Sequence, residues 1–356
     1  MYFYSEEPQE GKAGEERCEP KQTEPRSELR WHPILRQWVI NATHRQDRTY
    51  KPPAEFCPLC PTQPGAFPTE VPEPDYEIVV FQNRFPALSG TAPRLPGQAP
   101  EGSELYAVEP GQGECEVVLY SSQHDGVLWE LGLPRIRSLI EVWIDRFEEL
   151  GARPEVQYVL IFENRGDAVG VTLHHPHGQI YALPFIPPIP ERELESAKAH
   201  HAAHGRCLFC DVMEEEKKDG RRIVFENDHF TAFVPFFARY PYEVHLMPKR
   251  HVETIAGLTA EERQAMAEGM QQVVWRYDSL WNKPMSYMMI MHQAPTDGGA
   301  HPYTHFHVEF YPLNRTETKL KHLAGCESGA GTFVTDMAPE EQAEHLQNVK
   351  LKEARK

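Results

Sequence analysis

Short apolar runs separated by turn residues divide the first half of the chain into segments of strand type. Trp38, Val39 and Ile40 lie in an alternating stretch, residues 78–81 read IVVF, and ECEVVLYSS and QYVLIFEN follow later. Runs of this length predict strands. Residues 135–150 instead place apolar side chains on one face at helical spacing, which predicts an amphipathic helix. The members of that face are Ile136, Leu139, Ile140, Trp143, Ile144 and Phe147.

The second half of the chain repeats this order. RRIVFENDHFTAFVP and EVHLMPKRH predict strands, and SYMMIM and YTHFHVEFYP predict two more after a long helical pattern. That helix is expected to begin after Thr259, because Glu262 stands three residues later and the two complete a capping box.

Matching motifs in the two halves indicate an internal duplication. VVFQNRF matches IVFENDHF, CPLC matches CLFC, and the HPH of 175–177 matches the HFH of 305–307. His124 and His251 also precede these histidine pairs by nearly equal lengths of chain. We therefore predict an α+β fold of two duplicated modules, each with antiparallel strands and one long helix.

Composition and charge restrict the domains and the partners. Residues 1–29 are charged and poor in aliphatic side chains, so we predict a disordered tail there, then modules over 30–190 and 191–347 and a charged tail over 348–356. The formal net charge of −17 argues against nucleic acid and against an anionic membrane surface. No stretch has the length of a spanning helix and the first residues do not form a signal peptide, so we expect a cytoplasmic protein.

Four of the seven cysteines form two C-x-x-C pairs, and each pair has two histidines at matching positions in its half. Two thiolates and two imidazoles are a usual ligand set for a closed, structural zinc site. The alternative is a redox dithiol, which the matched histidines disfavour. We therefore predict two zinc ions per chain. The predicted sets are Cys57, Cys60, His124 and His175 for site 1, and Cys207, Cys210, His251 and His305 for site 2.

The segment LHHPHGQIYALP (173–184) is the strongest candidate for catalysis. On an extended strand, His175 and His177 would point to the same face, so a zinc ligand at 175 would hold His177 beside it. Gly178 would let a phosphate approach closely, and Gln179 could donate an amide hydrogen bond to it. An imidazole so placed could attack phosphorus and form a covalent intermediate. His177 could also be a third metal ligand or a surface residue.

The segment HHPHGQIYALPFIP resembles the active-site segment of the galactose-1-phosphate uridylyltransferases, a family of the histidine-triad superfamily. The resemblance extends from Arg30 to about Gln347 and includes ATHRQDR, FQNRFPAL, ENRGDAVGVT, ERE, THFHVEFYP and KHLAGCESGAGTF. It implies duplicated histidine-triad-like modules, the substrates UDP-glucose and galactose 1-phosphate, and a homodimer.

The resemblance also implies roles for single residues. His177 matches the nucleophile that becomes uridylylated, and Gln179 matches a glutamine that binds the phosphoryl oxygens. The remaining positions match substrate-binding residues. They are Arg45 and Arg48 for sugar-phosphate groups, Asn83, Asn164, Gly170 and Thr172 for the nucleotide sugar, and Lys321 and Glu327 in a late glycine-rich loop.

Three departures from the family pattern affect the second metal and the specificity. Family members build a second metal site from one glutamate and three histidines. The corresponding residues, Glu193, His292, His305 and His307, compete with the second cysteine set for His305, and iron would be possible there. Phe333 stands where a sugar-binding glutamine is expected, and Arg84 stands where an aspartate is frequent.

Two other functions remain open. An ADP-glucose phosphorylase of the same superfamily would use the same His177 with adenine and inorganic phosphate. A zinc-stabilised nucleotide-binding protein without catalysis is the alternative of another class, and the intact HPHGQ argues against it.

Overall fold

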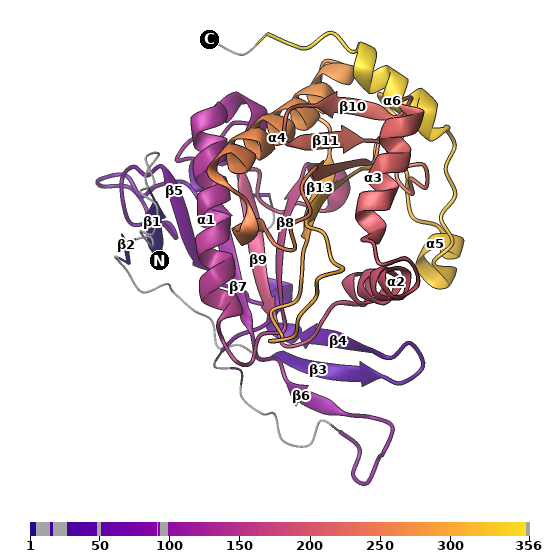
Figure 1. Cartoon of the computed structure of the whole chain (residues 1–356). Coiled ribbons are helices and arrows are strands. Elements are labelled where there is room, and N and C mark those ends of the chain that lie inside the picture. Colours follow the sequence, from indigo (N-terminus) through magenta and orange to yellow (C-terminus); the bar gives the residue numbers. More distant parts are fainter. Residues whose placement is uncertain (5–14, 17–26, 48–50, 91, 93–98, 354–356) are drawn as a thin grey trace.

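A computed structural model of the chain describes residues 1–4, 15–16, 27–47, 51–90, 92 and 99–353 (Figure 1). Its main feature is a sheet of eleven strands that runs through both halves of the chain, with every neighbouring pair antiparallel. In spatial order the strands are β10 (Ile223–Glu226), β11 (Phe230–Phe233), β12 (Val244–Pro248), β14 (His307–Pro312), β13 (Tyr287–His292), β8 (Tyr158–Arg165), β9 (His177–Leu183), β7 (Glu114–Leu119), β5 (Ile78–Gln82), β1 (Tyr2–Tyr4) and β2 (Glu15–Glu16).

Two long helices cover one face of this sheet. The helix predicted over 135–150 is α1 (Leu133–Gly151), and its partner is α4 (Ala260–Leu280). Their buried apolar side chains pack against those of the sheet in one core that includes Trp143, Met270 and Phe310. The predicted capping box is confirmed, because the Thr259 hydroxyl accepts from the Glu262 N–H while the Glu262 carboxylate accepts from the Thr259 N–H.

The other elements surround this two-layer core. A second sheet of three strands has the order β4 (Gln37–Ala42), β3 (Ser27–His32) and β6 (Val108–Pro110), and it lies at one end of the molecule in Figure 1. The remaining α-helices are α2 (Pro188–His204), α3 (Leu208–Asp219), α5 (Gly325–Ala330) and α6 (Pro339–Asn348). Five short 3-10 turns are described as well: η1 (Thr43–Asp47), η2 (Ala54–Phe56), η3 (Leu128–Leu131), η4 (Asp167–Val169) and η5 (Ile255–Gly257).

The duplication is visible in the strand order, although one strand does not correspond in the way that the matching sequence motifs indicate. The order β1-β5-β7-β9-β8 in the first half mirrors β10-β11-β12-β14-β13 in the second. β5 therefore occupies the place of β11, although VVFQNRF matches the sequence of β10. The place of β10 is taken by β1, whose residues Tyr2–Tyr4 belong to the tail predicted over 1–29 and instead pair with β5. Three aromatic residues in a row suit a strand better than a solvated tail.

Candidate active site and metal centres

His177 is the first residue of β9, and its ring is held by the backbone of the preceding turn. Its Nδ1 lies 2.7 Å from the carbonyl oxygen of His175. A proton donated from Nδ1 to that carbonyl leaves the lone pair on Nε2. The sequence pattern predicts both histidines on one strand. The strand begins only at His177, so His175 supports the His177 ring through its carbonyl group while its own side chain turns into a buried cluster. Burial lowers the pKa of His177, which favours the neutral imidazole.

Gln179 lies in a row of paired residues that crosses four strands. Phe81 of β5 pairs with Val117 of β7, Val117 with Gln179 of β9, and Gln179 with Phe162 of β8. Directly paired residues of antiparallel strands project from the same face. The amide of Gln179 therefore stands among apolar side chains, and His177 lies two residues before it on the same strand face.

A cavity of about 220 Å³ opens over this row. Apolar side chains such as Leu59, Phe81 and Val117 form part of its wall. A wall that is apolar over part of its area and polar elsewhere suits a ligand with both a ring and charged groups. The cavity also brings together seven of the residues that the sequence singled out. They are Arg45, Asn83, Asn164, Gly170, Thr172, His177 and Gln179.

Three polar residues at this cavity already have protein partners. A guanidinium nitrogen of Arg45 donates to the carbonyl of Phe85 at 2.8 Å, which holds the charged end of this side chain beside the site. The Asn83 side chain accepts from the Phe85 N–H at 2.9 Å, so Asn83 is a turn residue as well as a wall residue. Arg84 forms an ion pair with Glu70 at 2.8 Å. Arg48, the second predicted arginine, lies outside the described residues.

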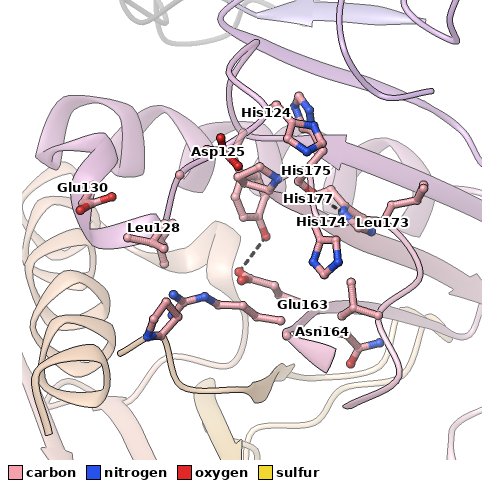
Figure 2. A pocket seen from close by; sticks show the side chains of 18 residues that line it. His124, Asp125, Leu128, Glu130, Glu163, Asn164, Leu173, His174, His175 and His177 are labelled. Atoms are coloured by element: carbon pink, nitrogen blue, oxygen red, sulfur yellow. Dashed lines mark hydrogen bonds between the residues drawn. The ribbon is translucent and has the colours of Figure 1, made fainter. Parts of the chain in front are cut away.

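A second cavity, of about 300 Å³, also has His177 in its wall (Figure 2). Its wall includes Glu163, which is not among the site residues expected from the sequence. The Glu163 carboxylate accepts from the hydroxyls of Tyr120 and Tyr287, each at 3.0 Å, and burial raises its pKa above the usual value. The available signal was one acidic residue within the apolar run VLIFEN.

Gly178 has a different neighbour from the one expected. A Cβ built at this position would lie 2.4 Å from the Tyr120 hydroxyl oxygen, and Tyr120 is 1% exposed. The small side chain is therefore required by close packing between β9 and Tyr120. The approach of a phosphate, expected from the sequence, is therefore not needed to explain this glycine.

The first cysteine set comes together as predicted. The Cys60 sulfur lies 3.4 Å from Nδ1 of His124 and 3.6 Å from Nδ1 of His175, and Cys57 completes the group. Two ligands of one tetrahedral zinc ion are roughly 3.6 Å apart when one is sulfur and one nitrogen. Nε2 of His175 lies 2.8 Å from the carbonyl oxygen of Ser121, a contact that orients the ring with Nδ1 toward the thiolates. These four residues fit a structural zinc ion.

The second cysteine set has the same geometry. The Cys210 sulfur lies 3.7 Å from Nδ1 of His251 and 3.3 Å from Nδ1 of His305, and Cys207 is the fourth member. Nε2 of His305 lies 2.9 Å from the carbonyl oxygen of Pro248. These four residues also fit zinc.

The competing set predicted from the resemblance does not form with His305. The His305 ring belongs to the cysteine group, and Glu193, His292 and His307 instead gather with Glu309. Glu309 is not among the ligands expected from the sequence. Its position, two residues after His307 in a buried strand, is the one that Gln179 occupies after His177.

Lys321 and Glu327 lie away from both cavities beside His177. The Lys321 ammonium donates to the Glu327 carboxylate and to the carbonyl oxygen of Val334, each at 2.6 Å. The expected glycine-rich loop contains the short helix α5, in which Glu327 accepts from the N–H of Ala324. Phe333 packs against the ring of Tyr240. Within the described residues of one chain, the structure does not bring these groups to His177.

The chain consists of two α+β halves that share one sheet, and each half has a Cys₂His₂ group and an H-x-H pair. These features define a duplicated histidine-triad protein. The comparisons with known proteins agree. A model of the galactose-1-phosphate uridyl transferase N-terminal domain matches residues 16–187, and a model of the C-terminal domain matches residues 193–356. The chain belongs to the galactose-1-phosphate uridylyltransferase family.

Relatives and solved structures support this membership. A galactose-1-phosphate uridylyltransferase of Thermotoga maritima is 39% identical over 91% of this chain and 99% of its own length. One from Rattus norvegicus is 33% identical over 89% of this chain and 86% of its own. A solved uridylyltransferase superposes with a TM-score of 0.78 at 34% identity, covering 90% of this chain and 97% of that one. An ADP-glucose phosphorylase of Arabidopsis thaliana, with a TM-score of 0.68 at 24% identity over 91% and 100%, shares the fold.

Among the described residues, no helix combines the length and the apolar character needed to cross a bilayer.

Proposed function

We propose that this chain is a galactose-1-phosphate uridylyltransferase that converts UDP-glucose and galactose 1-phosphate into glucose 1-phosphate and UDP-galactose. The observation that carries the proposal is the His177 ring, whose Nδ1 is tied to a backbone carbonyl and whose Nε2 is left with the lone pair at the boundary of two cavities. The cytoplasmic location predicted from the sequence is kept as part of the proposal.

The first step forms a bond between Nε2 of His177 and the α-phosphorus of UDP-glucose. The bond from that phosphorus to the bridging oxygen breaks, and glucose 1-phosphate leaves with the electron pair. In the second step a phosphate oxygen of galactose 1-phosphate attacks the same phosphorus, the P–N bond breaks, and His177 is regenerated. Splitting the transfer in this way replaces one difficult displacement by two easier ones.

The residues around His177 receive supporting roles. The Gln179 amide would donate to a phosphoryl oxygen, where a fixed donor stabilises the charge that develops in the transition state. Arg45 would contact sugar-phosphate groups, Asn83 would contact the nucleotide, and Asn164, Gly170 and Thr172 would line the site of the nucleotide sugar. Contacts of Arg48, Lys321 and Glu327 with substrate, and the homodimer, stay predictions from the resemblance.

The two cysteine–histidine groups receive a structural role, each holding one zinc ion. With all four positions taken by protein ligands, neither ion would have an open position for substrate. The first group supports catalysis indirectly, because it fixes His175, whose carbonyl orients His177.

A covalent adduct tests the proposal. After incubation with UDP-glucose and an alkaline quench, intact-protein mass spectrometry should show the added mass of one UMP. His177→Ala should show none. His204→Ala removes an exposed histidine at the end of α2, away from both cavities, and should keep the adduct. An AMP adduct with ADP-glucose, and none with UDP-glucose, would replace the proposal with a phosphorylase of the same chemistry.

A further inference from the structure

The end of β7 supports the short segment that carries His177. Leu119, the last residue of β7, pairs with His177 across the sheet. The next residue, Tyr120, donates its backbone N–H to the carbonyl oxygen of Pro176 at 3.3 Å. The backbone immediately before the candidate nucleophile is therefore fixed by this end of β7.

The Tyr120 side chain contacts the same segment on the other face of the sheet. Successive residues of a strand project to opposite faces, so Gly178 faces away from the side on which His177 and Gln179 lie. A Cβ at Gly178 would clash with the Tyr120 hydroxyl oxygen and would lie 3.2 Å from the ring carbon that carries it. The hydroxyl group therefore lies directly against the backbone one residue after the candidate nucleophile.

Buried contacts hold the Tyr120 side chain in this place. Its hydroxyl donates to the Glu163 carboxylate at 3.0 Å, and the same carboxylate accepts from the Tyr287 hydroxyl at 3.0 Å. Trp143 of α1 packs edge-on against the Tyr120 ring, with 6.2 Å between the ring centroids. Burial raises the pKa of both tyrosines well above the usual value, so their hydroxyls keep their protons and act as donors. Through Tyr287, the second half of the chain contributes to this support.

We propose that Tyr120, held in place by Glu163, is a positioning residue for the uridylyl transfer. It fixes the backbone at Gly178 and thereby directs Nε2 of His177 toward the α-phosphorus. The inference rests on the proposed function, because it takes His177 as the nucleophile. A reacting atom must lie about 3–3.5 Å from its target, and a misplacement of about 1 Å can reduce a rate about 10²-fold. A shift of the backbone beside His177 would displace its ring by a comparable distance.

The test fills the space beneath Gly178 and then restores it. Gly178→Ala places a methyl group against the Tyr120 hydroxyl. Because Tyr120 is held on several sides, the backbone must move, and the single-turnover rate of uridylylation by UDP-glucose should fall about 10²-fold. Adding Tyr120→Phe removes the clashing oxygen, so the double variant should recover about tenfold of that rate. The UDP-glucose concentration that gives half the maximal rate should change less than about twofold, since only the reacting geometry is altered.

Tyr120→Phe alone decides the matter if Gly178→Ala fails to fold. It keeps the ring and the backbone N–H, removes the hydrogen bond to Glu163, and should lower the rate about tenfold. The matched control is Tyr277→Phe, in which an equally buried tyrosine of α4 loses a hydroxyl that donates to the carbonyl oxygen of Tyr242 at 2.7 Å. This control should keep the wild-type rate. Either a wild-type rate in Tyr120→Phe or a double variant no faster than Gly178→Ala would overturn the inference.

These results are distinct from a failure of the proposed function. A wild type that ADP-glucose labels and UDP-glucose does not would contradict uridylyl transfer, and the same rates would then be compared with ADP-glucose. Nitrogen-15 NMR of the His177 ring needs no turnover, and its signals are those absent from His177→Ala. Gly178→Ala should shift them and the double variant should return them toward the wild-type positions. Unshifted signals in Gly178→Ala would contradict the positioning role even in a chain that forms no adduct.

Discussion

His177 and His307 occupy equivalent places in the two halves, but the residues around them differ. Each ring donates through Nδ1 to the carbonyl of a histidine two residues earlier, and that histidine belongs to a Cys₂His₂ group. His177 is followed by glycine and glutamine and borders two cavities, whereas His307 is followed by valine and glutamate and is 2% exposed. The same device for orienting a ring therefore serves a candidate nucleophile in one half and a candidate ligand in the other.

The difference arises from the residues in one row across the sheet. The row through Gln179 continues from Phe162 to Ile290 of β13, then to Glu309 and to His245 of β12. Around Gln179 its members are apolar and leave room for a ligand. Around Glu309 it contains His245, and the neighbouring strand adds His292, so the space is filled by protein groups. A duplicated fold thus separates two functions by changing a few side chains on a common frame.

The largest effect should come from breaking the cysteine groups one at a time. Cys57→Ser and Cys210→Ser should each lose zinc and lower the melting temperature by about 10 °C, because metal binding is part of the folding free energy. Only Cys57→Ser should also reduce the uridylyl adduct, since its group fixes the carbonyl that orients His177. Differential scanning fluorimetry and adduct mass would measure both. Equal loss of adduct in both variants would contradict the functional difference between the halves.

The comparison can be sharpened at Gln179, whose equivalent in the second half is Glu309. Gln179→Ala removes one donor to the phosphoryl oxygens and should lower kcat by about 10²–10³-fold. Gln179→Glu should lose more than the alanine variant, because a carboxylate would stand beside a negatively charged phosphate. Steady-state kinetics with both variants would measure this order, and a glutamate variant more active than the alanine variant would exclude the proposed contact.

A buried ion pair anchors α1 to the sheet in the first half. Arg146 is 1% exposed at its side chain and forms two hydrogen bonds with Glu116 of β7, at 2.7 and 2.8 Å. Glu116→Ala should therefore cost about 3–5 kcal/mol in the free energy of unfolding, because it leaves a buried guanidinium without that partner. Glu149→Ala removes the partially exposed second partner and should cost about 1 kcal/mol or less. Urea denaturation would measure the difference, and equal costs would argue against burial as its cause.

The smallest expected effect concerns the start of the corresponding helix in the second half. Thr259 caps α4 by its side chain, whereas α1 begins after Gly132 without a side-chain cap. Thr259→Ala should cost about 1 kcal/mol in the free energy of unfolding. Thr259→Ser keeps the hydroxyl and serves as the control in the same denaturation experiment. A cost for serine equal to that for alanine would show that the cap is not responsible.

The parts of the fold that the sequence predicted well carry local signals. The face of α1 repeats at helical spacing, and Thr259 and Glu262 mark the start of α4 within four residues. The two Cys₂His₂ groups were predictable because their spacing recurs in both halves. By contrast, α2 has few buried residues and no strong apolar face, so its pattern did not predict a helix.

The parts of the site that the sequence missed depend on strand register. Glu163 and Glu309 are each a single acidic residue in an apolar strand, and their role depends on residues of other strands with which they interact. Likewise, Gly178 faces Tyr120, which is remote in sequence. Contacts of this kind form only when the strands pair in the correct register. A shift of the register by one residue would turn each of these side chains to the opposite face of the sheet.

The junction between β8 and β13 has a consequence for how the chain can be divided. These strands pair directly, and the Glu163 carboxylate accepts from Tyr120 of one half and Tyr287 of the other. A fragment ending between the halves would present β8 as a bare edge with an apolar surface, a template for association with other chains. If the chain were cut between the halves, each piece would need the other to complete its sheet. Each piece would nevertheless contain a full set of its own cysteine and histidine ligands.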